Sequence, residues 1–283
     1  MKPVIVAAVV ASMFGQVQEN RNTTLTDRKV SLARIIRDVS EYEFSMGESV
    51  EQKLTRSSAP VLRWNHPMRG VDDAVVFVWS DEDRPEVVGT VMSFRSNVLR
   101  RTYEFVSLCE HPVSAVRDGK RVWYPSKPGI EWKPLPDAPV PAATAPVRLS
   151  QMRTIAGTFS SSVELLDGER YELRLLTQPI HRYGRDDTDL LDGAMFAFAD
   201  RTDPELLVLL EVRKSKEANQ WWYALARMSA LSIEVKHKSL KIQTFQRLPF
   251  GPNPTGTYTN PEEAGPLDLT IKEKATREEK EPK

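Results

Sequence analysis

Two stretches of this chain share one pattern of residues, and an internal repeat constrains a fold more than any other sequence feature. In each stretch a segment that ends in an apolar run, at residues 72–79 and 191–198, is followed by a proline–glutamate pair and a second apolar run. Tyr103 follows Ala74 by 29 residues, and Tyr223 follows Ala194 by the same number. The shared spacing predicts two copies of one folding unit. The alternative is chance similarity between two amphipathic hairpins.

Each copy is expected to begin with a helix, because apolar residues recur there at helical spacing. The helical positions are Leu32, Ile35, Ile36, Val39, Tyr42 and Met46 in the first copy, and Leu149, Met152, Ile155, Phe159 and Val163 in the second. Runs rich in Val, Phe and Tyr then indicate about five strands per copy, and Asp118 and Gly119 predict a hairpin turn.

These patterns predict an α+β fold made of an internally duplicated unit, in which one helix is followed by an antiparallel β-meander of about five strands. Two arrangements are open: the units lie side by side in one pseudo-symmetric sheet, or they are independent domains separated by the proline-rich spacer. We favour the first, because pairing would bury the apolar surface that a single sheet with one helix leaves exposed.

Changes in composition give the domain boundaries. Seven of the twenty prolines lie between Pro125 and Pro146, and proline removes backbone donors and favours extended chain. We therefore predict a first α+β unit at residues 24–132, a proline-rich linker at 133–146 and a second unit, the pseudo-repeat of the first, at 147–248. Residues 249–283 lack hydrophobic periodicity and are expected to form a disordered charged tail.

The N-terminus has the pattern of a secretory signal peptide, here predicted at residues 1–15. Lys2 is followed by an uncharged run at residues 4–14, which is shorter than the roughly 20 residues of a membrane span. We expect an exported protein, periplasmic or extracellular, without a transmembrane segment in the mature chain. The alternative is that this run forms a buried first strand.

The composition excludes several classes of function. Thirty-nine basic and thirty-nine acidic residues give a formal net charge of zero, so no excess of positive charge favours nucleic acid. The single cysteine, Cys109, cannot form an intramolecular disulfide, and no two of the four histidines have zinc-binding spacing. No glycine-rich phosphate-binding motif is present, and we predict no cofactor and no metal.

Candidate binding residues lie beside the repeated prolines. His66 and Arg69 flank Pro67, and His181 and Arg182 follow Pro179. In equivalent loops these side chains could bind an anion or a carboxylate, since arginine offers a forked pair of donors. The alternative is that they are ordinary solvated charges in loops.

Adjacent tryptophans give a second candidate surface. Trp221 and Trp222 point to opposite faces if they lie on a strand, so one is expected in the core and the other toward solvent. A solvent-facing tryptophan is a feature of recognition surfaces. Cys109 has only Glu110 and His111 beside it, and we interpret it as a buried thiol and not as a nucleophile.

Five segments carry a resemblance to a known family. Residues 79–85, 149–153, 175–179, 192–198 and 223–229 resemble a large family of uncharacterised exported bacterial proteins, over about residues 20–247. The resemblance implies export and a single-family architecture. It supplies no catalytic residues.

The sequence favours an exported, non-catalytic binding or interaction protein of the cell envelope. A groove in a sheet is expected to hold an apolar small molecule or another envelope protein. The alternative is an envelope enzyme resembling a hydrolase, whose site is assembled from dispersed residues, with His66, Arg69, Glu104, His111 and Arg182 as the candidates. Neither a catalytic motif nor a catalytic residue is predicted.

Overall fold

The computed structural model describes residues 31–47, 52–94, 99–184 and 189–265. The chain divides into two compact units, one formed by residues 1–41 and 265–283 and the other by residues 42–264. Residues 31–39 of the first unit form a helix. The second of these units, residues 42–264, contains both copies of the repeated pattern.

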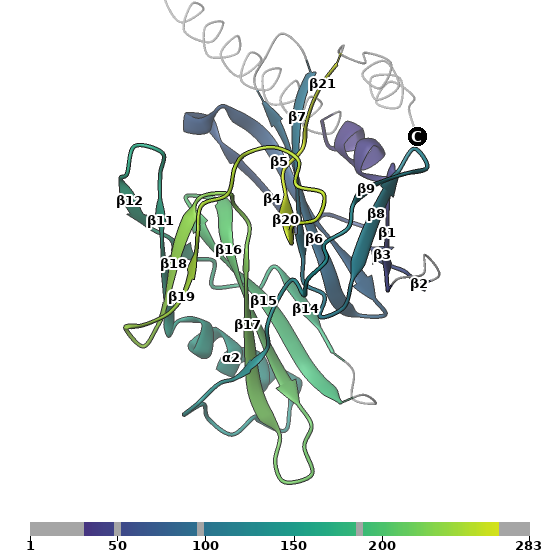
Figure 1. Cartoon of the computed structure of the whole chain (residues 1–283). Helices are drawn as coiled ribbons and strands as arrows, with labels where there is room; N and C mark the ends of the chain where they lie inside the picture. Colours follow the sequence, from purple (N-terminus) through teal and green to yellow (C-terminus); the bar gives the residue numbers. More distant parts are fainter. Residues whose placement is uncertain (1–30, 48–51, 95–98, 185–188, 266–283) are drawn as a thin grey trace, which may run out of the picture. The chain divides into compact units, whose positions relative to one another are not determined.

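Short and long strands make up most of this unit (Figure 1). The first half (residues 42–134) contains β1 (Tyr42–Met46), β2 (Gln52–Lys53), β3 (Thr55–Arg56), β4 (Leu62–His66), the 3-10 turn η1 (Pro67–Arg69), β5 (Val71–Asp81), β6 (Arg84–Phe94), β7 (Leu99–Ser107), β8 (Val113–Arg117), β9 (Lys120–Trp123) and β10 (Lys133–Pro134). The second half (residues 145–265) contains α2 (Ala145–Ala156), β11 (Phe159–Glu164), β12 (Arg170–Glu172), β13 (Arg174–Leu175), β14 (His181–Tyr183), β15 (Leu190–Asp200), β16 (Asp203–Arg213), β17 (Gln220–Arg227), β18 (Ser232–His237), β19 (Leu240–Phe245), β20 (Tyr258–Thr259) and β21 (Glu262–Gly265).

The two halves have the same sheet order. Each forms a small sheet, β2-β1-β8-β9 in the first half and β12-β11-β18-β19 in the second. Each also contributes to a large antiparallel sheet, β20-β7-β6-β5-β3 with β4 and β21 added, and β10-β17-β16-β15-β13 with β14 added. Strands β1 to β9 thus occupy the same places as β11 to β19.

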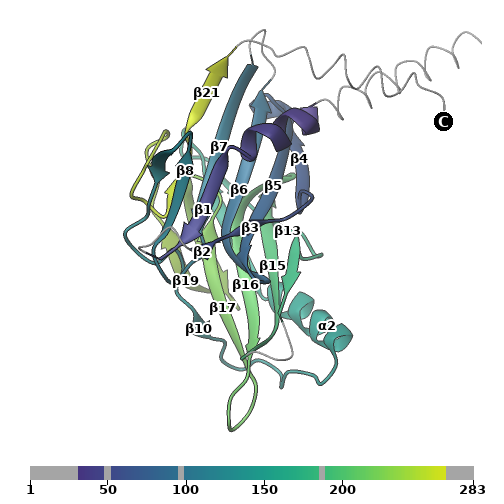
Figure 2. The same cartoon turned by 90° about the vertical axis from the view of Figure 1, so that its right-hand side faces the viewer.

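The last short strands are exchanged between the halves. β10 ends the first half but pairs with β17 of the second, with Lys133 opposite Tyr223. β20 of the second half returns to pair with β7 of the first, with Tyr258 opposite Val106. Figure 1 shows β20 beside β7, and Figure 2 shows β10 beside β17. Each half therefore completes the large sheet of the other.

The two large sheets pack face to face through a central core. Alternation along β15 directs Met195 and Ala197 into this core, while Phe196 and Phe198 point to the opposite face of the sheet. Strand β5 contributes Val76 to the same central core. The long strands read as nearly continuous apolar runs because both of their faces are buried.

The outer faces of the large sheets are covered differently in the two halves. In the first half, aromatic rings fill the space between the sheets: Phe44 of β1 lies 4.5 Å from Trp79 and 5.1 Å from Phe105, between ring centroids. In the second half, Met152 and Ile155 of α2 are part of the corresponding core.

The predicted fold class is wrong. The structure is mostly β, with 52% strand and 11% helix, and each half forms two sheets in place of one helix and one meander. Tyr42 and Met46 lie in β1, and Phe159 and Val163 lie in β11, where helix was expected. Residues four apart share a face in a helix and also in a strand, because four is an even number, so the spacing did not discriminate.

The expected linker and tail contain regular structure. Lys133 and Pro134 form β10, and Ala145 begins α2. Residues 258–259 and 262–265 form β20 and β21, so the tail is not disordered as far as residue 265. Composition reports whether a segment can form a core by itself, whereas these segments add to an edge that is already present. The predicted signal peptide and residues 266–283 lie outside the described residues.

The two halves do not lie side by side in one sheet, which is the arrangement that the sequence favours. Their large sheets stack face to face. The hairpin predicted at Asp118 and Gly119 is present: it joins β8 to β9, with φ of 51° and 70° at these two residues. Neither helix in the described part of the chain is long and apolar enough to cross a membrane.

Candidate functional site

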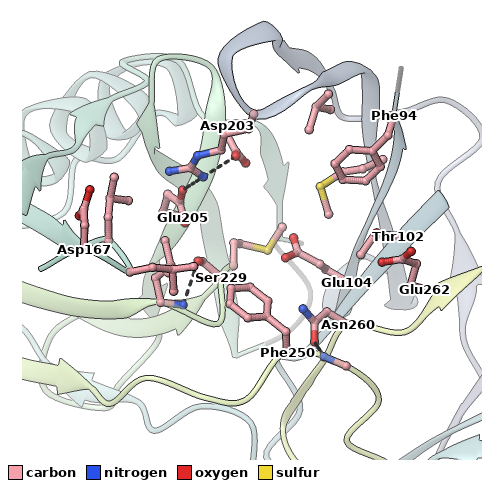
Figure 3. A pocket seen from close by; sticks show the side chains of 18 residues that line it. Phe94, Thr102, Glu104, Asp167, Asp203, Glu205, Ser229, Phe250, Asn260 and Glu262 are labelled. Carbon is pink, nitrogen blue, oxygen red and sulfur yellow. Dashed lines mark hydrogen bonds and ion pairs between the residues drawn. The ribbon is translucent and has the colours of Figure 1, made fainter. Parts of the chain in front are cut away.

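A cavity of about 750 Å³ lies between residues of the two halves. Strands β5, β6 and β7 supply one side, and β16, the segment after β17 and the loop after β11 supply another. The returning segment that carries β20 and β21 contributes Phe250, Asn260 and Glu262 (Figure 3). The cavity therefore exists only when both halves and the exchanged strand are in place.

One wall of the cavity is a cluster of carboxylates around Arg69. Its guanidinium donates to Asp200 at 2.9 Å, to Asp203 at 3.0 Å and to Glu205 at 2.6 Å. Burial raises the pKa of Asp203 well above its usual range, and the carboxyl groups of Glu205 and Glu104 raise it further. One guanidinium thus contacts three carboxyl groups, and the burial of Asp203 makes its ionisation unfavourable.

The local chain geometry places Arg69 in the cluster. Pro67 begins the turn η1, and the Nδ1 atom of His66 accepts a hydrogen bond from the backbone N–H of Arg69 at 3.2 Å. Gly70 ends the turn with a φ of 72°, a conformation that favours glycine. In neutral His66 the other nitrogen, Nε2, therefore carries the proton and donates to Asp200 at 3.2 Å.

Glu104 of β7 provides a further acid inside the cavity. Burial raises its pKa to about 8, and the nearby carboxyl of Glu205 acts in the same direction. The Tyr258 hydroxyl, on the exchanged strand β20, donates to Glu104 Oε1 at 2.6 Å. This carboxyl is therefore largely protonated at neutral pH, and a cation beside it would favour its ionised form.

The cavity also has an apolar part of its lining. Eight of the lining side chains are hydrocarbon, aromatic or thioether groups: Val71, Met92, Phe94, Leu165, Leu166, Met228, Leu231 and Phe250. Phe250 is 59% exposed. The lining combines apolar side chains with a smaller number of polar groups, which is the composition of small-molecule sites.

The charged groups of the lining are mainly acidic. Five lining residues are acidic (Glu104, Asp167, Asp203, Glu205 and Glu262), whereas Arg69 is the one basic residue among them. Because three carboxylates already contact Arg69, the cavity offers negative charge or acidic hydrogen-bond donors to a ligand.

The predicted binding residues do not gather in one site. Arg69 lines the cavity, and His66 lies behind it, 3% exposed. Arg182 binds both carboxylate oxygens of Asp192, at 3.1 and 2.8 Å, outside the cavity lining. Burial lowers the pKa of His181, and its Nε2 is buried without a hydrogen-bond partner among the described residues.

The two arginines also lie at different places in their halves. Arg182 lies opposite Ala194 on β15, and Arg63 lies opposite Val75 on β5. Arg63 binds both oxygens of Asp73 at 2.7 Å, as Arg182 binds those of Asp192. The counterpart of Arg182 is therefore Arg63 and not Arg69. In both Arg182 and Arg63, a carboxylate already accepts the guanidinium hydrogen bonds that an anion would need.

The tryptophan pair packs against the hydrophobic cores and does not form a binding surface at the cavity. Trp221 is 2% exposed, and its Nε1 donates to the carbonyl of Pro139 at 2.8 Å. Trp222 is partly buried against the central core, with the guanidinium of Arg213 at 5.0 Å from its ring centroid. The two rings do point to opposite faces, but neither lines the cavity.

Cys109 lies away from the cavity and is buried. Burial raises the pKa of its thiol to about 12, and the carboxyl of Glu86 raises it as well. His111 approaches the sulfur with its backbone N–H, at 3.4 Å. A thiol with this pKa is not a nucleophile at neutral pH.

The sequence reasoning named Glu104 and Arg69 among dispersed candidates but missed Asp203, Glu205 and Asn260. One signal for the two acids was present: Glu205 directly precedes the apolar run of residues 206–210 on β16. A carboxylate inside a buried strand needs a compensating partner. The contribution of Asn260 had no sequence signal, because it depends on the return of β20 to the first half.

Comparisons with protein-family models, with curated proteins and with solved structures find no match to this chain. In the described part of the chain, no group of three or more His, Cys, Asp or Glu side chains is placed to hold a metal ion. The geometry of the cavity is therefore the basis for a functional proposal.

Proposed function

We propose that this chain is an exported, non-catalytic binding protein that holds a small amphipathic molecule in the cavity between its two halves. The observation that carries the proposal is the cavity of about 750 Å³, whose lining includes eight apolar and five acidic side chains. Small-molecule sites commonly have volumes of roughly 300–1,000 Å³ and a few polar groups that orient the ligand.

The polar groups support binding more than catalysis, because they are engaged with one another. Arg69 is held by three carboxylates, and Glu104 accepts a hydrogen bond from Tyr258. The hydroxyl oxygen of Ser229 accepts a hydrogen bond from the backbone N–H of Leu231 at 3.1 Å. No histidine or cysteine is found among the described residues that line the cavity, so Ser229 has no imidazole base there.

Export rests on the sequence of the N-terminus and on the family resemblance. A chain delivered to the cell envelope would meet small molecules that diffuse there, and a binding role fits such a location. Intact mass of the protein purified from its own host tests this part: a mature chain shorter than the full sequence supports export, and equal masses contradict it.

The binding proposal is tested by native mass spectrometry of the same protein, combined with titration of the neutral fluorescent probe N-phenyl-1-naphthylamine. We expect either a retained small molecule that is lost on denaturation, or a saturable rise in probe fluorescence with one site per chain. A chain without an adduct that also fails to bind the probe would contradict the proposal.

The hydrolase alternative is supported by one observation. Glu104, with its pKa raised to about 8, could donate a proton, while Asp203 and Glu205 lie in the same cavity. Turnover of an ester or glycoside that depends on Glu104 would favour an enzyme, whereas binding of an unchanged ligand favours the proposed function.

A further inference from the structure

The exchanged strands make the two ends of the central interface comparable, residue by residue. On β10, Lys133 lies opposite Tyr223 of β17. In the returning segment, the carbonyl of Pro261 accepts a hydrogen bond from the backbone N–H of Tyr103 on β7, at 2.9 Å. Tyr223 and Tyr103 occupy matching places, opposite residues 210 and 91 of β16 and β6. The residues just before Lys133 and Pro261 are therefore counterparts.

These counterparts are Trp132 and Asn260, and they differ greatly in size. Trp132 is 8% exposed and belongs to the central core. The guanidinium groups of Arg84 and Arg213 lie 5.4 and 4.6 Å from its ring centroid. A large aromatic side chain thus fills one end of the interface between the large sheets.

The surroundings of Trp132 have counterparts at the other end, and these line the cavity. Strands β6 and β16 each have eleven residues, so their first residues, Arg84 and Asp203, match, as do their last, Phe94 and Arg213. Asp203 and Phe94 line the cavity together with Asn260. The cavity therefore lies where the tryptophan side chain lies at the opposite end.

One of the two compared positions carries opposite charge at the two ends: Arg84 lies beside Trp132, and its counterpart Asp203 lines the cavity. The aromatic ring of Trp132 lies against two guanidinium groups, whereas the corresponding positions of the cavity carry a carboxyl group, at Asp203, and an aromatic ring, at Phe94. Figure 3 shows Glu104 near the middle of the labelled side chains, with Asp203 and Glu205 to one side and Phe94 to the other. An occupant of this space would meet acidic groups and an aromatic ring.

We infer that the ligand of the cavity is a cationic aromatic molecule, whose ring takes the place left open by Asn260 and whose ammonium or guanidinium group faces Glu104 and Asp203. The inference rests on the proposed function and specifies its ligand class. The ring would pack against Phe94, and the positive charge would be complementary to the acidic wall.

Isothermal titration calorimetry with three small probes tests the inference. Tryptamine has an indole ring and an ammonium group, indole-3-acetate has the same ring with a carboxylate, and hexylamine has the ammonium group without a ring. We expect tryptamine to bind at least about tenfold more tightly than either of the others. Equal affinity of indole-3-acetate would overturn the charge preference, and equal affinity of hexylamine would overturn the aromatic preference.

Two variants connect the affinity to the cavity. Asn260→Trp places at this end the side chain that fills the other end, and we expect it to abolish tryptamine binding. Asn260→Ala, which leaves the cavity open, is the matched control and should retain binding. Glu104→Gln is expected to weaken tryptamine binding about tenfold and to weaken binding of the neutral probe much less, and it provides a test if Asn260→Trp does not fold.

Failure of the ligand class is distinguishable from failure of the proposed function. If N-phenyl-1-naphthylamine binds and Asn260→Trp blocks it, while tryptamine has no advantage, the cavity is a binding site but its ligand is not a cationic aromatic molecule. If neither the neutral probe nor tryptamine binds, the proposed function itself fails.

Discussion

At the scale of single residues, the buried carboxyl groups of Glu104 and Glu86 have raised pKa values. Burial raises the pKa of Glu104 to about 8 and that of Glu86 to about 7. The ordinary value of about 4.3 applies to both in the unfolded chain. Between the unfolded and folded values, the folded protein binds more protons than the unfolded chain. The contribution of these two carboxyl groups to stability is therefore fully present below about pH 4 and is lost as pH rises through 7 and 8.

Glu104→Gln should reduce this pH dependence. We expect the free energy of unfolding of the natural protein to fall between pH 5 and pH 9, and that of the variant to fall less, because the amide oxygen still accepts from Tyr258 but does not ionise. Urea unfolding at pH 5, 7 and 9 measures the difference. The other titratable groups that act on this carboxyl are Tyr258, Glu205, Asp203, Arg69 and Arg227.

The control is Glu217→Gln at an exposed position, which should keep the pH profile of the natural protein. Identical profiles for the natural protein and Glu104→Gln would show that Glu104 is ionised freely in the folded state.

Gly89 is a second residue whose identity is set by its neighbours. A Cβ atom at this position would lie 2.8 Å from the rings of Phe105 and Trp79. The matching residue of β16 is Val208, which lies opposite Leu225 where Gly89 lies opposite Phe105. The aromatic core of the first half thus requires a glycine where the second half holds a valine.

Gly89→Ala is therefore expected to lower the free energy of unfolding by about 1–3 kcal/mol through overpacking. Combining it with Phe105→Leu, the residue found in the second half, should give a loss smaller than the sum of the two single losses. Urea denaturation of the four members of this cycle measures the coupling. Strict additivity would contradict a clash between these two positions.

At the scale of elements, short strands that add to existing edges are the features least accessible to sequence reasoning. β10 and β20 have two residues each, too few for a period to be recognised. Their hydrogen bonds nevertheless extend the large sheets at β17 and β7, and Tyr258 of β20 is 2% exposed. The tail that composition assigned to disorder includes a residue of the central core.

Truncation after Arg247 should consequently destabilise the protein. Removal of β20 leaves the backbone groups of β7 at Tyr103 and Ser107 without their partners in the returning segment and exposes the surface that Tyr258 covers. We expect a loss of roughly 3–5 kcal/mol, comparable to deleting one large buried aromatic side chain. Truncation after Gly265 keeps these contacts and is the control. Equal stability of the two truncated chains would contradict a structural role for β20.

At the scale of residues 42–264, the exchange of β10 and β20 joins two halves with the same sheet order. The shared order supports the proposal that the halves arose by duplication. Because each large sheet is completed by a strand from the other half, and because the central core takes residues from both, neither half buries its apolar surface alone.

Unfolding of the whole chain should therefore be a single cooperative transition. We expect the urea transitions followed by tryptophan fluorescence and by far-ultraviolet circular dichroism to coincide. Four of the six tryptophans lie in the first half and two, Trp221 and Trp222, in the second, so fluorescence reports on side-chain packing weighted toward the first half, whereas the dichroism reports on the strands of both. Two separate transitions would show that the halves fold as independent domains.

The sequence by itself determined the segments at residues 72–79 and 191–198, which lie in β5 and β15, the hairpin at Asp118 and Gly119, and the matched spacing of the two halves, because alternation and turn chemistry act over a few residues. Only the tertiary structure decided that residues around Phe44 and Phe159 are strands and that β10 and β20 cross between halves. It also decided that Trp132 fills one end of the interface while Asn260 leaves the other open. These outcomes depend on which edges and faces meet across distant parts of the chain, and the cavity follows from a difference in side-chain volume that becomes visible only when the two ends are compared in space.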